Sequence, residues 1–413
     1  MLLPKIYNMK EKLAQKPPKL LFDMSQFQYF GSNNGETGIY RTADEIFKKL
    51  AARSDIDLYC LVDGSKNYKN IADYLKKTNP HYTGKIVYLK HLKKMARDKN
   101  FILRIKSKIL YALFSKKYCN IIKKFDWYFS PFDMTNPFLY KKIKTSIIIH
   151  DMIPLLYQEF ADPEFTSYFA KLANSVEADF IFCDSQCARN DFLKYRKDYD
   201  PGKVIVAYLA ASSRFRPIQN KILIERVKEK YRIGTEKYFL SVSNFNPRKN
   251  LLFVVKNFLD FIKNNKIGDL SLVLSGPEKN QFKQGLSMAL PQHQDLLGKV
   301  IFTDFVDDVD LVTLYNGALA FVYMSLYEGF GLPPLEAMQS GIPVITSNNS
   351  SLKEVVGDAG ITLDPQDNEA LILAFQTIYN NVSIRSELSE KGLEMANNFS
   401  WDKMVDQIVN VFI

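Results

Sequence analysis

Cysteine, histidine and long hydrophobic runs are all scarce in this 413-residue chain. Its four cysteines include no CxxC pair, which argues against a disulfide-stapled scaffold and favours a reducing compartment. Its four histidines stand singly, without the spacing of a zinc site. The longest uncharged run, Leu311–Tyr327, has 17 residues and contains Asn316 and Gly317, so it indicates a helix end and a buried strand rather than a membrane span. Glycine and proline, with 18 and 17 residues, are too few for a collagen-like or low-complexity chain.

The remaining composition is that of a globular protein, with 46% hydrophobic and 24% charged residues. The length predicts two or three domains, and two is the simplest count. Lysines and a glutamate interrupt residues 1–22, so we expect no export signal there. These features together favour a cytoplasmic protein.

Charge is unevenly distributed along the chain. Residues 1–217 carry 37 basic and 22 acidic residues, whereas residues 218–413 carry 18 and 23. Residues 85–124 alone hold 13 basic residues and one acid, interleaved with apolar residues at roughly helical spacing. Such a basic amphipathic segment suits an anionic membrane surface, with Lys93, Lys94, Lys106 and Lys108 as candidate contacts, or it is simply a solvated helix face. Nucleic acid is the least favoured partner, since no RNA- or DNA-binding signature accompanies the charge.

Short β-rich runs alternate with helical patterns twice along the chain. Their apolar continuity is typical of parallel strands buried on both faces, which predicts an α/β fold with two doubly wound domains facing across a cleft. The series restarts after residue 217, so we place a domain boundary near 216–222. Ligands of such sheets bind beyond the carboxyl ends of the strands. The expected strands are Leu20–Ser25, Ile56–Val62, Trp127–Ser130, Ser146–His150, Phe180–Asp184 and Val204–Tyr208 in the first series, and Phe239–Ser243, Ser271–Ser275, Lys299–Thr303, Ala320–Met324 and Pro343–Thr346 in the second.

One cluster of motifs follows the expected strand Ala320–Met324. Glu328 and Glu336 stand eight residues apart, with a Gly-Phe-Gly turn and two prolines between them. The glycines allow a ligand to approach the backbone, and the prolines fit the first turn of a helix, where we also place Glu336. A helix N-terminus attracts phosphate, and a carboxylate beside it can bind vicinal hydroxyls such as those of a ribose. Seen alone, Glu336 would be an ordinary complement to the helix dipole.

Three further segments end or follow strands of the second series. Arg248 and Lys249 lie at a strand–loop–helix junction, where they can clamp a diphosphate, although such a pair is often only a solvated turn. Gly276 follows the next strand and predicts a tight turn facing the same cleft. Asp308 belongs to a DxD triplet, but we interpret these acids as helix caps rather than metal ligands.

The order of these motifs resembles the retaining glycosyltransferases of family 4, which have the GT-B fold. The resemblance covers about 125 residues of the second half nearly continuously. It rests on SVSNFNPRKNL, LVLSGPE, VIFTDFVDDVDLVTLY, SLYEGFGLPPLEAMQSGIPVITS and LKEVVGDAGITLDP. In the first half, GSNNGETGIYRTADEIFKKL, FIFCDSQCARNDF and IIIHDMIPL are similar more weakly, the last to the mannosyltransferase-like branch.

The resemblance implies a role for each matching position. Arg248 and Lys249 would bind the donor pyrophosphate, and Glu336 the ribose hydroxyls. Glu328 would contact the donor sugar as a catalytic residue. Backbone and side-chain contacts to the donor would come from Gly38, Gly276, Asp308, Leu311, Gly329, Phe330, Gly331 and Leu332.

His150 is the second catalytic candidate that the resemblance implies, near the donor sugar, and Asp151 and Pro154 fit the same motif. A core histidine at a strand end is the alternative. One departure concerns Ser243, which stands where many family members have an arginine that assists phosphate binding. The resemblance also implies residues 1–217 as an acceptor-binding domain and 218–398 as a donor-binding domain, with residues 399–413 forming a helix that packs back on the first.

A GT-B enzyme needs no metal, because cations and a helix dipole stabilise the leaving diphosphate. No second carboxylate suggests itself as a nucleophile, so a front-face route with retention is the hypothesis. We therefore predict a metal-independent hexosyl- or deoxyhexosyltransferase, with a mannose-like or rhamnose-like sugar moved from a nucleotide-sugar to a glycan or lipid-linked acceptor of a surface polysaccharide such as O-antigen or capsule. The expected location is the inner face of the membrane. The alternatives are a non-catalytic GT-B partner subunit and another sugar-nucleotide enzyme of that fold.

Overall fold

The computed structural model describes most of the chain. The described residues are 16–24, 27, 38–63, 67–78, 82, 86–89, 120–132, 143–160, 162–234, 236–277, 279–303 and 306–413. Most of the basic segment 85–124 lies outside them, including Lys93, Lys94, Lys106 and Lys108. Among the described residues, no helix has the length and apolarity needed to cross a membrane.

The first half of the chain forms a seven-stranded parallel sheet. Its order is β3-β2-β1-β4-β5-β6-β7, so β1 lies inside the sheet and later strands are added on both sides of it. The strands are β1 (Lys19–Asp23), β2 (Asp57–Asp63), β3 (Ile86–Leu89), β4 (Trp127–Ser130), β5 (Lys144–Ile149), β6 (Phe180–Cys183) and β7 (Val204–Val206).

The second half forms a six-stranded parallel sheet with the order β10-β9-β8-β11-β12-β13. Here β8 pairs with both β9 and β11, so the loops after these three strands leave the same edge of the sheet side by side. The strands are β8 (Lys237–Val242), β9 (Leu270–Ser275), β10 (Val300–Thr303), β11 (Ala320–Tyr323), β12 (Val344–Ser347) and β13 (Ile361–Leu363). The predicted α/β architecture with two doubly wound sheets is confirmed.

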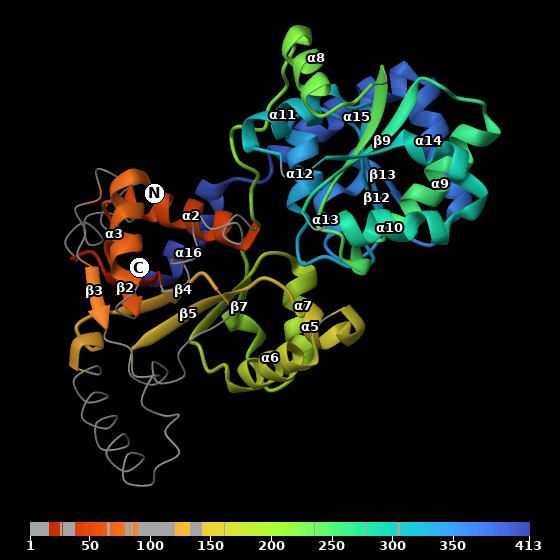
Figure 1. Cartoon of the computed structure of the whole chain (residues 1–413). Coiled ribbons are helices and arrows are strands. Elements are labelled where there is room, and N and C mark those ends of the chain that lie inside the picture. Colours follow the sequence, from red (N-terminus) through yellow and green to blue (C-terminus); the bar gives the residue numbers. More distant parts are fainter. Residues whose placement is uncertain are drawn as a thin grey trace, which may run out of the picture.

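Helices cover both faces of the second sheet (Figure 1). Alternate residues of a strand point to opposite faces, and in β8 the side chains of Tyr238 and Leu240 join one hydrophobic core while Phe239 joins another. Since both faces are buried, these strands are continuously apolar. The helices of this half are α8 (Lys221–Lys230), α9 (Leu251–Asn264), α10 (Lys279–Ala289), α11 (Asp308–Gly317), α12 (Leu332–Gln339), α13 (Leu352–Val356), α14 (Asn368–Asn380), α15 (Val382–Ala396) and α16 (Trp401–Phe412).

The last helix returns to the first half. In Figure 1 the blue α16 lies beside α2, among the red and orange elements. The ring centroid of Phe412 in α16 lies 5.0 Å from that of Trp127 in β4. The Lys49 ammonium of α2 pairs with the Asp402 carboxylate of α16 at 2.8 Å. The α-helices among the described residues of the first half are α2 (Gly38–Ala51), α3 (Asn67–Thr78), α5 (Ile153–Leu156), α6 (Pro163–Ser175) and α7 (Gln186–Tyr195).

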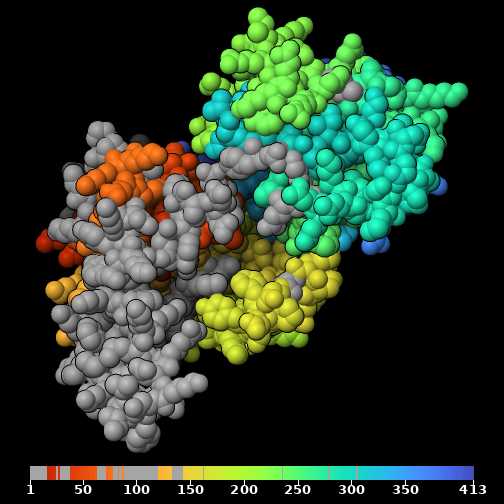
Figure 2. All heavy atoms as spheres, in the orientation of Figure 1, coloured from red at the N-terminus to blue at the C-terminus, as the bar shows by residue number. Residues whose placement is uncertain are grey.

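The two sheets lie on either side of residue 217 in the sequence, and the space-filling view shows the surface around α6 and α7 (yellow) meeting that of the second half (Figure 2). The assignment of acceptor binding to residues 1–217 and donor binding to 218–398 stays a prediction. Two edge strands, β3 and β13, were absent from the predicted set. Both are short, at four and three residues, so they carry little periodic signal.

Candidate active site

The loop after β8 positions two cations at the sheet edge. Asn246 caps a short 3₁₀ turn, Pro247–Lys249, by accepting a hydrogen bond from the Arg248 N–H at 2.9 Å. Asn250 then adopts a left-handed conformation (φ 56°), which asparagine tolerates better than most residues, and α9 begins. This sharp reversal turns the Arg248 and Lys249 side chains toward the loop that follows β11.

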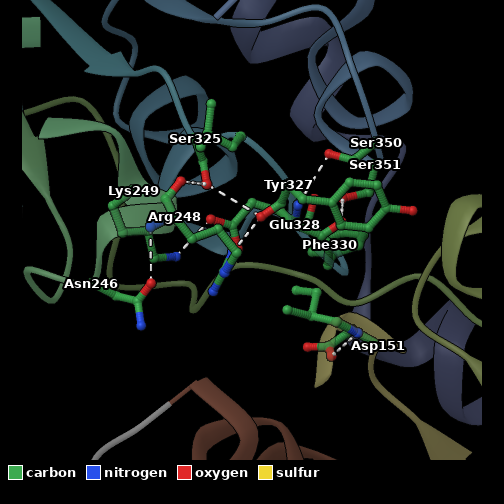
Figure 3. Close-up of polar contacts among 12 residues, drawn as sticks. Asp151, Asn246, Arg248, Lys249, Ser325, Tyr327, Glu328, Phe330, Ser350 and Ser351 are labelled. Atoms are coloured by element: carbon green, nitrogen blue, oxygen red, sulfur yellow. Dashed lines mark hydrogen bonds and ion pairs between the residues drawn. The ribbon is translucent and has the colours of Figure 1, made fainter. Parts of the chain in front are cut away.

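Glu328, in the loop after β11, forms ion pairs with both Arg248 and Lys249 (Figure 3). Its Oε2 lies 2.9 Å from the Arg248 guanidinium, and its Oε1 lies 2.6 Å from the Lys249 ammonium. The Tyr323 hydroxyl donates to Oε1 at 2.9 Å. Arg248 also donates to the Tyr327 carbonyl. These groups form one buried polar cluster, since Glu328 is only 8% exposed.

The charges of this cluster depend on one another. Burial alone would raise the pKa of Glu328, but Lys249 and Arg248 outweigh burial and lower the pKa to about 2. For Lys249, burial outweighs the attraction of Glu328, and its pKa falls below the ordinary value. For Arg248, burial is outweighed by Glu328 and the pKa rises. A buried carboxylate with two cations leaves net positive charge, which suits an anionic ligand.

The first half meets this cluster through backbone. A Cβ atom on Gly329 would overlap the His150 carbonyl oxygen and lie 2.7 Å from the Asp151 Cβ. Only glycine therefore permits this approach of the two halves. The Ser185 hydroxyl fixes the contact by donating to the Gly329 carbonyl at 2.6 Å.

Asp151 faces the cluster from the end of β5, as Figure 3 shows. Its Oδ1 accepts from the Ile153 N–H at 2.9 Å, which starts α5. Burial raises the pKa of Asp151, while Arg248 acts in the opposite direction and Glu328 reinforces the rise. The structure thus brings a carboxyl group of the first half near Arg248 and Glu328, whereas the sequence motif had pointed to the neighbouring His150.

The His150 side chain is held inside the first half. Its Nδ1 lies 2.6 Å from the Asp184 carboxylate, and its Nε2 lies 3.0 Å from the Pro131 carbonyl. Both ring nitrogens therefore lie against oxygen atoms of the first half. The residue is 6% exposed, and the His150 atom that lies against Gly329 of the second half is its backbone oxygen.

Glu336 occupies a second buried position. The prediction that it lies in the first helical turn is wrong: Gly331 is the N-cap, α12 starts at Leu332, and Glu336 is the fifth helical residue. The prolines do occupy the first turn, as predicted. Because Glu336 lies one turn inside, it is 7% exposed, and the Tyr315 hydroxyl donates to its Oε2 at 3.1 Å. Burial raises its pKa to about 7, although Arg41 and Tyr315 act against the rise.

The start of α12 lies against the start of α2. Gly331 has φ 115°, a conformation that favours glycine, and its turn lets the helix begin abruptly. The Leu332 side chain lies 3.3 Å from the position that a Cβ on Gly38 would take. Phe330 is buried, with its ring 6.4 Å from Tyr208 of the first half. The predicted donor-binding residues Gly38, Gly329, Phe330, Gly331 and Leu332 therefore all lie where the two halves meet.

The remaining predicted donor residues lie at the same sheet edge. Asp307 caps α11 by accepting from the Asp310 N–H at 2.9 Å, and Leu311 is buried. Asp308 pairs instead with Arg41 at 2.8 Å and with Arg214. Gly276 has φ 156°, and a Cβ atom on it would overlap the Ser243 carbonyl oxygen, so Ser243 meets Gly276 through its backbone.

Several residues that form contacts between the two halves were not predicted from the sequence. Glu354 of α13 accepts from the Gln186 and Cys187 N–H groups, both at 2.9 Å, at the start of α7. The Tyr208 hydroxyl donates to the same carboxylate at 3.1 Å. Arg41, which pairs with Asp308 of α11, is another such residue. Each contact joins positions more than 140 residues apart, and no local pattern signals it.

Comparisons with known proteins indicate the family of this chain. The family profile described as "Glycosyl transferases group 1" matches residues 224–395. The O-antigen chain mannosyltransferase B of Escherichia coli is 31% identical over 265 residues, which cover 64% of this chain and 68% of that protein. The serotype-specific mannosyltransferase WbdA of Escherichia coli is 31% identical over 262 residues, but the chain spans only 32% of its length.

Solved structures extend the likeness to both halves. Anabaena Alr3699/HepE, in complex with UDP and glucose, has a TM-score of 0.68 at 16% identity, over 95% of this chain and 99% of that one. This likeness shows the fold, which is GT-B. Together with the motifs at the sheet edge and the identity to O-antigen chain mannosyltransferase B, it shows that the chain belongs to the group 1 glycosyltransferases, family 4, and is a glycosyltransferase.

Proposed function

We propose that this glycosyltransferase moves mannose, or a related hexose or deoxyhexose, from a nucleotide-sugar to the growing glycan of a surface polysaccharide such as O-antigen. The convergence of Arg248 and Lys249 on Glu328, at the carboxyl edge of the second sheet, is the observation that carries the proposal. Support for the sugar comes from the two mannosyltransferase relatives, and support for the donor from the UDP named in the HepE structure.

Arg248 and Lys249 would hold the donor diphosphate in this scheme. Guanidinium and ammonium groups form charge-assisted hydrogen bonds to phosphate, and a site already arranged around Glu328 needs little reorganisation. The diphosphate would leave with its negative charge balanced by these cations, so the reaction would need no metal. Full activity in excess EDTA is the expected result, and loss of activity that Mg²⁺ restores would contradict it.

Transfer by a front-face route, with retention of the anomeric configuration, follows from the same contacts. Glu328 is held by two cations, which makes it a poor nucleophile. Asp151 is a second carboxyl group nearby, and its Oδ1 is engaged by the Ile153 N–H, which weakens it as a nucleophile. A product with inverted configuration, detected by NMR of the new glycosidic bond, would contradict this route.

Peripheral binding to the inner membrane face remains a proposal that rests on the charge of residues 85–124. Each basic residue near an anionic leaflet contributes about 1 kcal/mol, and salt screens the attraction. We expect salt-sensitive co-sedimentation with anionic vesicles and little with neutral ones. Reversal of charge at Lys93, Lys94, Lys106 and Lys108 should abolish it, and unchanged binding of that variant would remove the proposal.

A donor panel tests the proposed function. Nucleotide-sugars with guanine, uracil, thymine or adenine bases, carrying mannose, rhamnose or glucose, would be incubated with the protein and a lipid-linked acceptor. Transfer from a mannose donor is the expected result. Transfer of a different sugar would correct the donor, and absence of both transfer and donor hydrolysis across the panel would favour the non-catalytic partner subunit.

A further inference from the structure

Two arginines of the first half reach the donor region of the second. Arg41, in the first turn of α2, lies 2.8 Å from Asp308 and 3.6 Å from Glu336. Arg214, in the segment after β7, pairs with the other oxygen of Asp308. The two differ in one respect: an ion pair with Glu336 is formed by Arg41 and not by Arg214 among the described residues.

We propose that Arg41 is a positioning residue for the donor nucleotide: its guanidinium holds the Glu336 carboxylate for the ribose hydroxyls and thereby makes nucleotide binding depend on the contact between the two halves. This inference rests on the proposed function, in which Glu336 binds the ribose.

The groups around Glu336 explain why Arg41 is important for its charge. Tyr315 of α11 donates to one carboxylate oxygen, and Arg41 approaches the other. Asp308, also of α11, raises the pKa of Glu336, while Arg214 lowers it less than Arg41 does. Tyr323 of β11 also interacts electrostatically with Glu336. On its other side α12 packs against α15 through Met338 and Gly392, which carry no charge.

Ribose binding should depend on whether Glu336 is ionised. A carboxylate accepts hydrogen bonds from two neighbouring hydroxyls, whereas a protonated carboxyl group offers one acceptor fewer. Burial leaves Glu336 with a pKa of about 7, so its ionised form depends on the remaining opposite charge. An opposite charge within about 4–6 Å lowers a carboxyl pKa by about 1–3 units. Without Arg41, Glu336 would be protonated through neutral pH and the ribose contact would weaken.

The experiment compares a ribonucleotide with its 2′-deoxy counterpart. The tightest binder among GDP, UDP and ADP would be titrated calorimetrically from pH 6 to pH 9, beside the matching 2′-deoxynucleoside diphosphate. In the parent we expect a ribo preference of about tenfold at pH 7.5, the size of a hydrogen bond to a charged group. In Arg41→Met we expect that preference to fall below about threefold at pH 7.5 and to return near pH 9, because the pKa of Glu336 rises by about one unit or more.

Two matched variants separate the role from general charge loss. Arg214→Met removes the same charge from Asp308 but leaves the Arg41–Glu336 contact, so its ribo preference and pH profile should stay near those of the parent. Arg41→Lys keeps a cation and should retain the parent pH profile with a smaller loss. It also keeps the test decisive if Arg41→Met fails to fold.

Three results would overturn the inference. They are an unchanged ribo preference with unchanged affinities in Arg41→Met, an unchanged ribo preference with an equal loss for both ligands, which would place Arg41 on the phosphates instead, and tighter binding of the ribonucleotide in Arg41→Met. Arg248→Ala distinguishes this failure from failure of the proposed function. If Arg248→Ala weakens both ligands while Arg41→Met changes neither, only the inference about Arg41 fails; if Arg248→Ala also changes neither, the donor site itself is wrong.

Discussion

Glu328 and Glu336 lie on the same loop and helix, eight residues apart and equally buried, yet their carboxyl groups behave in opposite ways. Glu328 has two cations within 2.9 Å and a pKa lowered to about 2. Glu336 has one cation at 3.6 Å, from the other half of the chain, and a pKa raised by burial to about 7. Burial pushes both pKa values upward, so the number and distance of the partners decide the outcome.

The difference between the two glutamates shows which parts of the proposed donor site depend on the contact between the two halves. The groups that pair directly with the Glu328 carboxylate, namely Arg248, Lys249 and Tyr323, all belong to the second half. The surroundings of Glu336 are incomplete without Arg41. The diphosphate part of the site should therefore survive changes at the boundary between the halves, whereas the ribose part should respond to them.

Glu328→Gln should cause the largest loss of stability. Removing the carboxylate leaves Arg248 and Lys249 buried without their anion, and breaking a buried ion pair typically costs about 3–5 kcal/mol. The measurement is the free energy of unfolding from urea titration at pH 7.5. Glu387→Gln is the matched control, because it removes an exposed partner of Lys391, and should leave the free energy of unfolding nearly unchanged. Equal effects of the two substitutions would mean that the cluster is solvated.

Glu336→Gln should increase the free energy of unfolding of the protein without nucleotide, in contrast to Glu328→Gln. A carboxyl group whose pKa is raised from 4.5 to about 7 on folding stabilises the fold below pH 4.5, and this contribution is lost as the pH rises through 7. Glutamine stays neutral, so the variant should gain up to about 3 kcal/mol on the parent between pH 5 and pH 8. Thermal unfolding at several pH values measures this gain. The pKa of Glu336 is not raised if the two proteins keep a constant difference in Tm over that range.

Glu354→Gln should have the smallest effect of the three. Its carboxylate caps α7 across the boundary, and glutamine loses one of the two acceptor oxygens, at a cost of about 1 kcal/mol. Fluorescence reports on this loss, because Trp127 and Trp401 both lie in the hydrophobic core that includes the first sheet. Glu164→Gln, which removes a first-turn carboxylate of α6, is the control and should cost a few tenths of that. A cost at Glu354 no greater than at Glu164 would show that the cap contributes nothing to the boundary.

Much of the fold could be predicted because its strands are buried on both faces. Continuous apolar runs such as Ser271–Ser275 leave little ambiguity, and the structure places that strand at Leu270–Ser275. Helix starts are harder to locate. The two prolines correctly indicated a first turn, but Gly331 rather than a later residue caps the helix, and this displaced Glu336 from the turn expected for it.

The site divides in the same way. Local motifs indicated Arg248, Lys249 and Glu328, since all three follow adjacent strands of one sheet. Contacts between the halves could not be predicted. Arg41 and Asp308, for example, are 267 positions apart, and no local sequence pattern indicates that they form a pair. The same holds for Asp184, whose place beneath His150 depends on the pairing of β5 with β6.

Calorimetric titration of a nucleoside diphosphate and its monophosphate, into the parent and Arg248→Ala at pH 7.5, tests the donor site most directly. The nucleotide would be the one among GDP, UDP, dTDP and ADP that gives the largest thermal shift. We predict that the parent prefers the diphosphate, and that Arg248→Ala loses about ten- to hundredfold in diphosphate affinity, the value of a charge-assisted contact, with little loss for the monophosphate. Diphosphate binding as tight in Arg248→Ala as in the parent would contradict the account.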